Sequence, residues 1–178
     1  RALALDPDDM EALAAQAYLD MLRSGFTSVA EFHYVHRQPD GRPYANPAEM
    51  SERIVAAART VGIGLTMLPV LYASGGIGQP PLHEQRRFLL DLDGYLSLVE
   101  TLRPQGMVGI APHSLRAVPA DLLLRLLRAV PEGPVHIHAA ERTEEVEECR
   151  AGLGAAPVEW LLATAGLDPR WTLVHATH

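Results

Sequence analysis

Two histidines and a glutamate lie close together in the stretch PVHIHAAERTEEVEEC, which runs from residue 134 to residue 149. The first half of this stretch is typical of a buried strand and the second half of a helix, so His136, His138 and Glu141 lie where the strand ends. Alternate side chains of a strand share a face, which places His136 and His138 together. Neutral imidazole binds zinc well but fills an apolar core poorly, because both of its nitrogens need partners.

The glutamate fits the same chemistry. Glu141 follows His138 by three residues, which lets it reach a water activated by a metal without binding the metal itself. A carboxylate in that position can take a proton from the water and return it to a leaving amine. The motif alone leaves an alternative open, in which both histidines are hydrogen-bonded core residues and Glu141 caps the following helix.

The rest of the chain alternates helix and strand. The strands are nearly continuous in apolar residues, which is typical of strands covered on both faces. Short connections between alternating elements predict an α/β fold with a parallel sheet and right-handed crossovers. No glycine-rich phosphate motif follows a strand, which argues against a dinucleotide-binding fold, but a closed barrel and an open doubly wound sheet both remain. The expected strands span residues 26–32, 63–72, 106–112, 134–140 and 171–177.

Several helices have recognisable ends. The first carries an apolar stripe from Met10 to Met21, and Asp8 or Asp9 is expected to cap it. A second helix is expected to start with Asn46 as its N-cap and Pro47 at its first position, and to end at Gly62. The remaining helices are expected near residues 91–103, 119–130, 142–150 and 157–165.

Histidines gather at the ends of the expected strands. Because the carboxyl ends of parallel strands converge on one pocket, Tyr34, His113, His138 and His175 are predicted to open onto one face of the sheet. His33 and His36 form a His-x-x-His pair in a loop, where we expect solvated surface residues. Six of the eight histidines lie within a few residues of a strand end: His33, His113, His136, His138, His175 and His178.

Composition excludes some classes of function. The 178 residues, 48% of them hydrophobic, suffice for one domain with a substantial core, and no apolar run is long enough for a membrane span. The net charge is −7 and all 15 basic residues are arginines, which argues against a nucleic-acid partner. The sequence shows no signal peptide, although Arg1 is not a natural start. The single cysteine, Cys149, cannot form an internal disulfide and suits a reducing, cytoplasmic compartment.

Five stretches of the chain resemble a known family. The resemblance is to the metal-dependent amidohydrolase superfamily and, within it, to the formimidoylglutamate deiminases (N-formimino-L-glutamate iminohydrolases). The His-x-x-Glu element is shared by many deaminases of the superfamily, whereas AEFHYVH and HSLRAV are closer to this subfamily. The stretches are VAEFHYVHRQPDGRPYA (29–45), GIGLTMLPVLY (62–72), HSLRAV (113–118), PVHIHAAERTEEVEEC (134–149) and PVEWLL…RWTLVHATH (157–178).

The resemblance implies a (β/α)8 TIM barrel with one zinc ion, which other divalent metals could replace. It also implies that residues 1–178 form a single partial barrel domain, approximately strands 2 to 6 with their helices. The first strand of the family carries a His-x-His pair of zinc ligands, and the eighth carries a metal-binding aspartate. We find neither in this chain, so the expectation is an internal piece of a longer enzyme, without the first strand and the last two.

The family's functional residues match individual positions of this sequence. His138 matches the zinc ligand of the fifth strand, Glu141 the proton shuttle, and His175 a histidine that orients the reacting group. The resemblance assigns substrate binding to Tyr34, His113 and Arg116, and leaves His136 as packing behind the site and His178 unassigned. The alternative for Arg116 is an ion pair with an acidic side chain on the barrel rim.

The resemblance implies hydrolysis of N-formimino-L-glutamate to N-formyl-L-glutamate and ammonia, a step of histidine degradation. It suggests a cytoplasmic homodimer with a small anionic substrate, and an isolated chain that is inactive. Two alternatives stay open. One is another deaminase of the superfamily, acting on a nucleobase or an S-adenosyl compound, although HSLRAV favours an acidic substrate. The other is an inactive barrel fragment or interaction module without a complete site.

Overall fold

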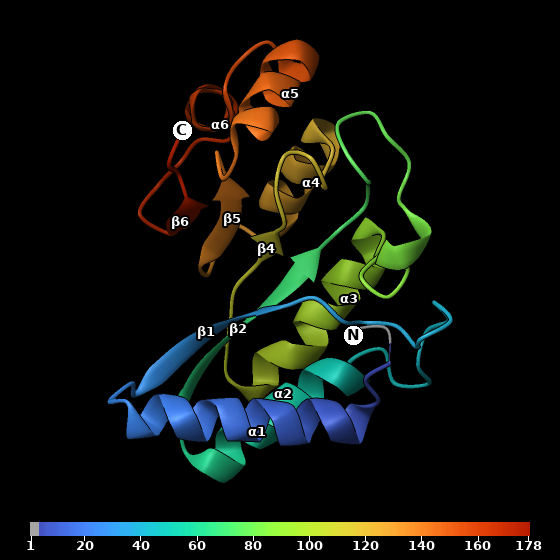
Figure 1. Ribbon diagram of the computed structural model, residues 1–178, viewed down its shortest axis with the longest axis vertical. Coiled ribbons are helices and arrows are strands. Elements are labelled where there is room, and N and C mark those ends of the chain that lie inside the picture. Colours follow the sequence, from blue (N-terminus) through green and yellow to red (C-terminus); the bar gives the residue numbers. More distant parts are fainter. Residues whose placement is uncertain (1–3) are drawn as a thin grey trace.

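The computed structural model describes residues 4–178, and its strands follow one another in chain order across the molecule (Figure 1). β1 pairs with β2, β2 pairs with β3 and with β4, and β5 pairs with β6, always in parallel. A parallel bridge between Ile110 and Val135 joins the two groups of strands. The strands are β1 (Ser28–His33), β2 (Gly64–Leu71), β3 (Met107–Val108), β4 (Ala111–Pro112), β5 (Val135–Ala139) and β6 (Trp171–His175).

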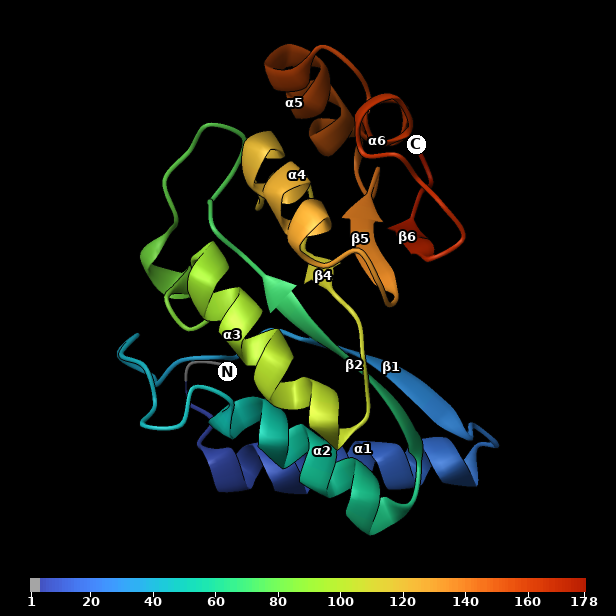
Figure 2. The same ribbon diagram turned by 180° about the vertical axis from the view of Figure 1, so that it is seen from behind.

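In residues 4–178, one α-helix precedes the first strand and five more lie between successive strands. Figure 2 shows α2, α3 and α4 lying over the same side of the strands. None of the helices in the part of the chain that the structure describes has the length and apolar character needed to cross a membrane. The helices are α1 (Pro7–Arg23), α2 (Glu49–Val61), α3 (Leu92–Leu102), α4 (Ala120–Ala129), α5 (Thr143–Leu153) and α6 (Pro157–Thr164).

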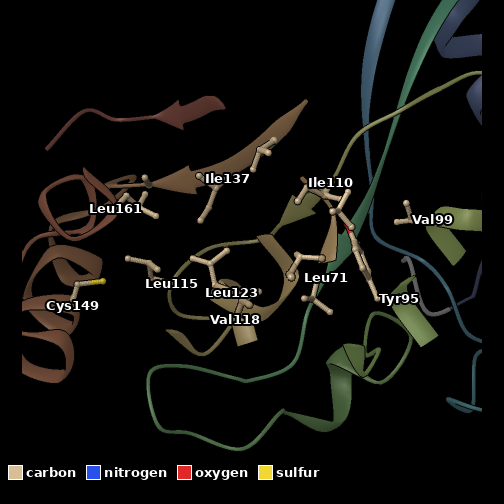
Figure 3. Packing of buried hydrophobic residues seen from close by; sticks show 14 residues of the cluster. Leu71, Tyr95, Val99, Ile110, Leu115, Val118, Leu123, Ile137, Cys149 and Leu161 are labelled. Carbon is tan, nitrogen blue, oxygen red and sulfur yellow. The ribbon is translucent and has the colours of Figure 1, made fainter. Parts of the chain in front are cut away.

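The core between strands and helices lies on one side of the sheet only. One apolar cluster joins α1 and α2 to β2 through residues such as Tyr18, Ile54 and Met67. A second cluster, drawn in Figure 3, packs Leu123 of α4 and Leu161 of α6 against β5. The opposite side of the strands carries a small cluster of strand and loop residues, with Leu68, Val70 and Ala111 at its centre.

This one-sided arrangement decides between the two folds that the sequence left open. A doubly wound sheet has helices on both faces, whereas the strands of a barrel follow chain order with helices outside and a shared interior. The described strands and helices form part of a (β/α) barrel, as predicted. Side chains of Phe32, Leu68 and Val70 point to the interior, and those of Val29, Met67 and Leu71 point to the helices.

The starts of two predicted helices differ in the structure. Asp6, rather than Asp8 or Asp9, caps α1; its Oδ1 accepts the Asp9 N–H, and Asp9 accepts the Asp6 N–H in return. Asn46 does not cap α2 directly, because its Oδ1 accepts from the N–H of Ala48 and the helix begins after that turn. Gly62 ends α2 in the left-handed conformation, as predicted.

The third predicted strand is divided into β3 and β4, with Gly109 and Ile110 between them. A Cβ on Gly109 would lie 2.5 Å from the carbonyl oxygen of Pro134, so only glycine permits this approach of the two chains. The buried Tyr95 of α3 secures the divided strand, because its hydroxyl donates to the Pro69 carbonyl at 2.7 Å and accepts from Ala111 N–H at 3.1 Å.

Tyr95→Phe should therefore destabilise the chain more than the loss of one hydroxyl on the surface. It leaves the Pro69 carbonyl and the Ala111 N–H buried without this partner, at a cost of about 1–3 kcal/mol. Urea unfolding followed by circular dichroism measures the change. Tyr72→Phe is the control, because the Tyr72 hydroxyl is only partly buried and its partner Gln85 can turn to water. Equal losses for both variants would contradict the bridging role.

Candidate active site

Four predicted side chains meet at the carboxyl ends of the strands. The ring centroids of Tyr34 and His113 are 5.5 Å apart, those of His113 and His138 are 4.9 Å apart, and those of His138 and His175 are 5.5 Å apart. These residues come from the ends of β1, β4, β5 and β6. The prediction that these strand ends share one face is confirmed, and the catalytic roles of the residues stay predictions.

A backbone carbonyl fixes the orientation of His138. The oxygen of His113 receives the backbone N–H of His138 at 2.9 Å and lies 3.1 Å from the Nδ1 of the same residue. A carbonyl only accepts, so Nδ1 carries the proton and Nε2 keeps its lone pair. Burial lowers the pKa of His138, as does the nearby His175, which keeps the ring neutral. His138 thus presents a free nitrogen in the tautomer that a metal ligand needs.

The backbone at His175 turns this side chain toward the site. His175 pairs in register with Ala139, whose side chain packs on the helix side, so regular alternation would point His175 away from His138. Instead His175 has a φ of 72° and ends the strand, and its ring lies beside that of His138. Left-handed backbone is uncommon for residues with a side chain and is held here by tertiary contacts.

The same conformation recurs at the end of β5. Ala140 has a φ of 53° and Ala176 a φ of 51°. Hydrogen bonds tie the two strand ends together, because the N–H of Ala176 donates to the Ala139 carbonyl at 2.8 Å and Thr177 donates to the Ala140 carbonyl from both N–H and hydroxyl. The residue before Glu141, Ala140, is therefore held by hydrogen bonds in a sparsely populated backbone conformation.

Glu141 lies between a histidine and an arginine. Its Oε1 is 3.8 Å from Nε2 of His175, and its Oε2 is 3.7 Å from Nη2 of Arg116. Arg116 also lies 4.0 Å from the carboxylate of Glu145. The ion pair that the sequence left open for Arg116 is therefore present, and it is made with the very residue predicted to be the proton shuttle.

Arg116 also borders open space. A cavity of about 560 Å³ is lined by Arg116 and Arg142 together with Gly75, Gln79 and Glu148. Of the predicted site residues, Arg116 lines this cavity, whereas Glu141 and His175 do not. A second, more apolar cavity of about 370 Å³ lies near Gly64 and Met107, where β2 and β3 begin, and is remote from the histidines.

Aromatic rings form the wall around His113. Tyr72 lies 4.7 Å from the His113 ring, and Phe32 lies 4.5 Å from the His138 ring. Burial, with Tyr72 and Glu141 nearby, raises the pKa of Tyr34 to about 12, so its hydroxyl stays a hydrogen-bond donor. Burial, with His138 and Arg116 nearby, lowers the pKa of His113 to about 3, so this ring is neutral.

Our sequence reasoning did not identify Tyr72 or Glu145. Tyr72 follows β2 directly, and the rule that found the histidines at strand ends would have found it as well. Glu145 lies among exposed acidic residues of α5, and its burial cannot be read from the spacing. His136 shares the interior face with His138, as predicted, and His178 is exposed.

The expectation for His33 and His36 is wrong. Both residues are 3% exposed, and their rings meet edge to face at 5.6 Å. Nε2 of His36 donates to the Val70 carbonyl at 2.9 Å, which ties the loop after β1 to β2. Burial lowers the pKa of His33 to about 3 and that of His36 to about 4, and both rings are neutral. His33 lies on the helix side of β1 because Tyr34, its neighbour, points to the interior.

Comparison with known proteins shows which family the chain belongs to. The sequence model of the amidohydrolase family matches residues 1–178. The chain belongs to the amidohydrolase family. The strand-end histidines and the His-x-x-Glu element thus lie in a hydrolase fold.

Individual members of the family and solved structures resemble the chain to different degrees. The chain is 48% identical over 181 residues to the formimidoylglutamate deiminase of Pseudomonas aeruginosa. The aligned region covers 98% of the chain and 40% of that relative. The chain matches the crystal structure of an amidohydrolase from Brucella melitensis with a TM-score of 0.97 and 49% identity, over 99% of the chain and 41% of that structure. A zinc-bound adenosine deaminase from Xanthomonas campestris shares the fold, with a TM-score of 0.72 and 20% identity over 99% of the chain and 36% of that structure.

The residues of this amidohydrolase fit part of a zinc site. His138 offers one nitrogen ligand in the required tautomer, with its other nitrogen held by the His113 carbonyl. Residues 4–178 contain no group of three or more histidine, cysteine, aspartate or glutamate side chains placed to hold a metal ion. A catalytic zinc normally has three protein ligands, and His138 could supply one of them.

We expect the buried His33–His36 pair to make the stability of this amidohydrolase depend on pH. The unfolded chain protonates both residues near pH 6.5, whereas the folded chain does so only near pH 3 to 4, so stability falls as the pH drops below about 6.5. Between pH 7 and pH 5 the pair should account for a loss of about 2–4 kcal/mol.

Urea unfolding at both pH values tests this prediction. The variant His33→Gln/His36→Gln should lose less stability than the unchanged chain between pH 7 and pH 5, because glutamine does not titrate. His83→Gln is the control, since His83 is exposed, and should keep the original pH dependence. An unaltered pH dependence in the double variant would show that the pair is not protonated on unfolding.

Proposed function

We propose that the protein containing this chain is a zinc-dependent deiminase that hydrolyses N-formimino-L-glutamate to N-formyl-L-glutamate and ammonia. The sequence similarity to a formimidoylglutamate deiminase supports this choice within the amidohydrolase family. One observation carries it furthest. Glu141 lies within 4 Å of both His175 and Arg116, which brings a proton carrier, an orienting imidazole and an anion-binding group to one place.

The bound zinc would lower the pKa of water toward about 7 and so supply a nucleophile at neutral pH. His138 would contribute one of its ligands. Glu141 would accept the proton of the attacking water and deliver it to the departing nitrogen, which would leave as ammonia. His175 lies beside both Glu141 and His138, where it can orient the reacting amidine by a hydrogen bond.

The other predicted residues would bind the carboxylates of the substrate. Arg116 has a planar fork of donors that matches a carboxylate, and Arg116 is one of the residues that line the cavity of about 560 Å³. The protonated hydroxyl of Tyr34, whose ring lies beside that of His113, would be a further donor. These donors favour an anionic substrate over a neutral nucleobase, whose flat ring offers no carboxylate to an arginine.

The proposal includes the biological setting expected from the sequence. It places the enzyme in histidine degradation, in the cytoplasm, as a homodimer with a small anionic substrate. It also makes residues 1–178 strands 2 to 6 of the barrel, with the remaining zinc ligands on segments outside this chain. The isolated chain would then bind zinc weakly and have no activity, because His138 alone cannot hold a catalytic ion.

The test uses the full-length protein and its zinc content. Ammonia release is measured with N-formimino-L-glutamate, guanine, cytosine and S-adenosylhomocysteine. We expect turnover of the first substrate and loss of that turnover when a chelator removes the metal. Faster release from a nucleobase or from the S-adenosyl compound would assign the protein to another deaminase activity, and no release from any substrate would contradict an enzymatic role.

Glu141→Gln in the full-length protein should abolish turnover while zinc stays bound. Glutamine keeps the shape of the side chain but cannot carry a proton at neutral pH, and such proton transfer contributes about 10²–10⁴-fold to a rate. Steady-state kinetics and metal analysis of the same preparation measure both quantities. Glu144→Gln, a change on the exposed side of α5, is the control. Near-full activity of Glu141→Gln would remove the shuttle role.

Substitutions of Arg116 should act on substrates according to their charge. Arg116→Met should raise KM for N-formimino-L-glutamate by about 10-fold or more, since a charge-assisted hydrogen bond contributes about 1.5–3 kcal/mol. Arg116→Lys keeps the charge but loses the bidentate fork, so it should still impair binding. A formamidine without carboxylates should be affected much less. An equal loss for both substrates would take Arg116 out of the binding site.

A further inference from the structure

Glu145 is a buried carboxylate next to the proposed active site. Its side chain is fully buried, although it lies in the first turn of α5 beside the exposed Glu144. A carboxylate removed from water is costly unless hydrogen bonds and an opposite charge compensate it. The groups that stabilise Glu145 are therefore informative about why an acidic residue occupies this position.

The first of these groups is the backbone of Glu141. Its N–H donates to Oε2 of Glu145 at 3.0 Å. This N–H follows directly after Ala140, whose φ of 53° turns the chain out of β5. Glu145 thus holds the residue that we propose as proton shuttle at a point where the backbone conformation is uncommon.

The second group is Arg116. Its Nη2 lies 4.0 Å from Oε2 of Glu145 and 3.7 Å from Oε2 of Glu141, so one cation lies between two carboxylates. Within residues 4–178, Nε of Arg116 and Oε1 of Glu145 are both buried and make no hydrogen bond. The two side chains therefore have unused donors and acceptors at short range, and a small rotation could bring them together.

We propose that Glu145 is a positioning residue, which holds the Glu141 backbone and keeps the charge of Arg116 from pairing with Glu141 alone. This inference rests on the proposed function of Glu141 and Arg116 and adds a third residue to them. With Glu145 charged, Arg116 is shared between two carboxylates, so it is held less tightly by Glu141 than in a single ion pair. Without that charge, Glu141 becomes the stronger partner of Arg116, and the ion pair competes with both proton transfer and substrate binding.

A purely structural role for Glu145 makes a different prediction. An acidic residue in the first turn of a helix interacts favourably with the helix dipole, and Glu144 occupies the same turn of α5. If Glu145 served only the helix, Glu144→Gln and Glu145→Gln would have similar effects, and neither would depend on Arg116. Glu144 is exposed and therefore provides a matched control for the same change of charge.

The experiment is a double-mutant cycle in the full-length protein, with kcat and KM normalised to bound zinc. Glu145→Gln should lower kcat/KM for N-formimino-L-glutamate by about 10-fold or more, through both kcat and KM. Glu144→Gln should stay within about twofold of the unchanged protein. In the Arg116→Met background the further effect of Glu145→Gln should shrink to within about twofold, because its partner is gone. Equal effects of Glu145→Gln in the two backgrounds would overturn the proposal.

The same variants distinguish a failure of this inference from a failure of the proposed function. If the protein releases no ammonia, the cycle is read from urea unfolding midpoints instead. Arg116→Met should then lower the midpoint in the unchanged protein, where it leaves Glu145 buried without its counter-charge, and lower it less in the Glu145→Gln background. Additive midpoints would reject the Arg116–Glu145 pair. If Glu145→Gln does not fold, the double variant, which removes both charges, should still fold better than Arg116→Met.

Discussion

The carbonyl oxygen of His113 is the contact on which the proposed active site depends. It accepts two hydrogen bonds from His138, one from the backbone and one from Nδ1, and so joins the end of β4 to the end of β5. Between these two segments the chain has few other backbone links, namely those of Ile110 to Pro134 and His136. The His113 carbonyl thus fixes both the distance between the two strand ends and the tautomer of the His138 ring.

The electrostatics of the site follow from that geometry. Once β5 is placed, its left-handed exit at Ala140 directs Glu141 toward Arg116 and His175. Arg116 is held in turn between Glu141 and the buried Glu145. The site therefore contains a cation that two carboxylates share, and an anionic substrate would have to compete with Glu141 for it. Such competition couples substrate binding to the freeing of the proposed proton shuttle.

The sequence predicted the parts of the structure that depend on periodicity and chain order. Apolar runs located all five strand regions, and the rule for parallel strand ends correctly predicted that Tyr34, His113, His138 and His175 lie together. Division of the third strand at Gly109 was not predicted, because it results from the approach of Pro134, a contact distant in sequence. The burial of His33 was missed because a loop motif says nothing about the helix that will cover it.

His175 shows most clearly why spacing alone is insufficient. Strict alternation in β6, in register with β5, would place this histidine with the helices, and only its φ of 72° returns it to His138. That conformation is stabilised by bonds from Ala176 and Thr177 to the end of β5, which exist only after the two strands have paired. The side chain at the end of β6 is thus positioned by the neighbouring strand rather than by its own. The backbone of His175 is thus tied to the strand that carries His138, and a fixed backbone next to a metal ligand is what an orienting imidazole requires.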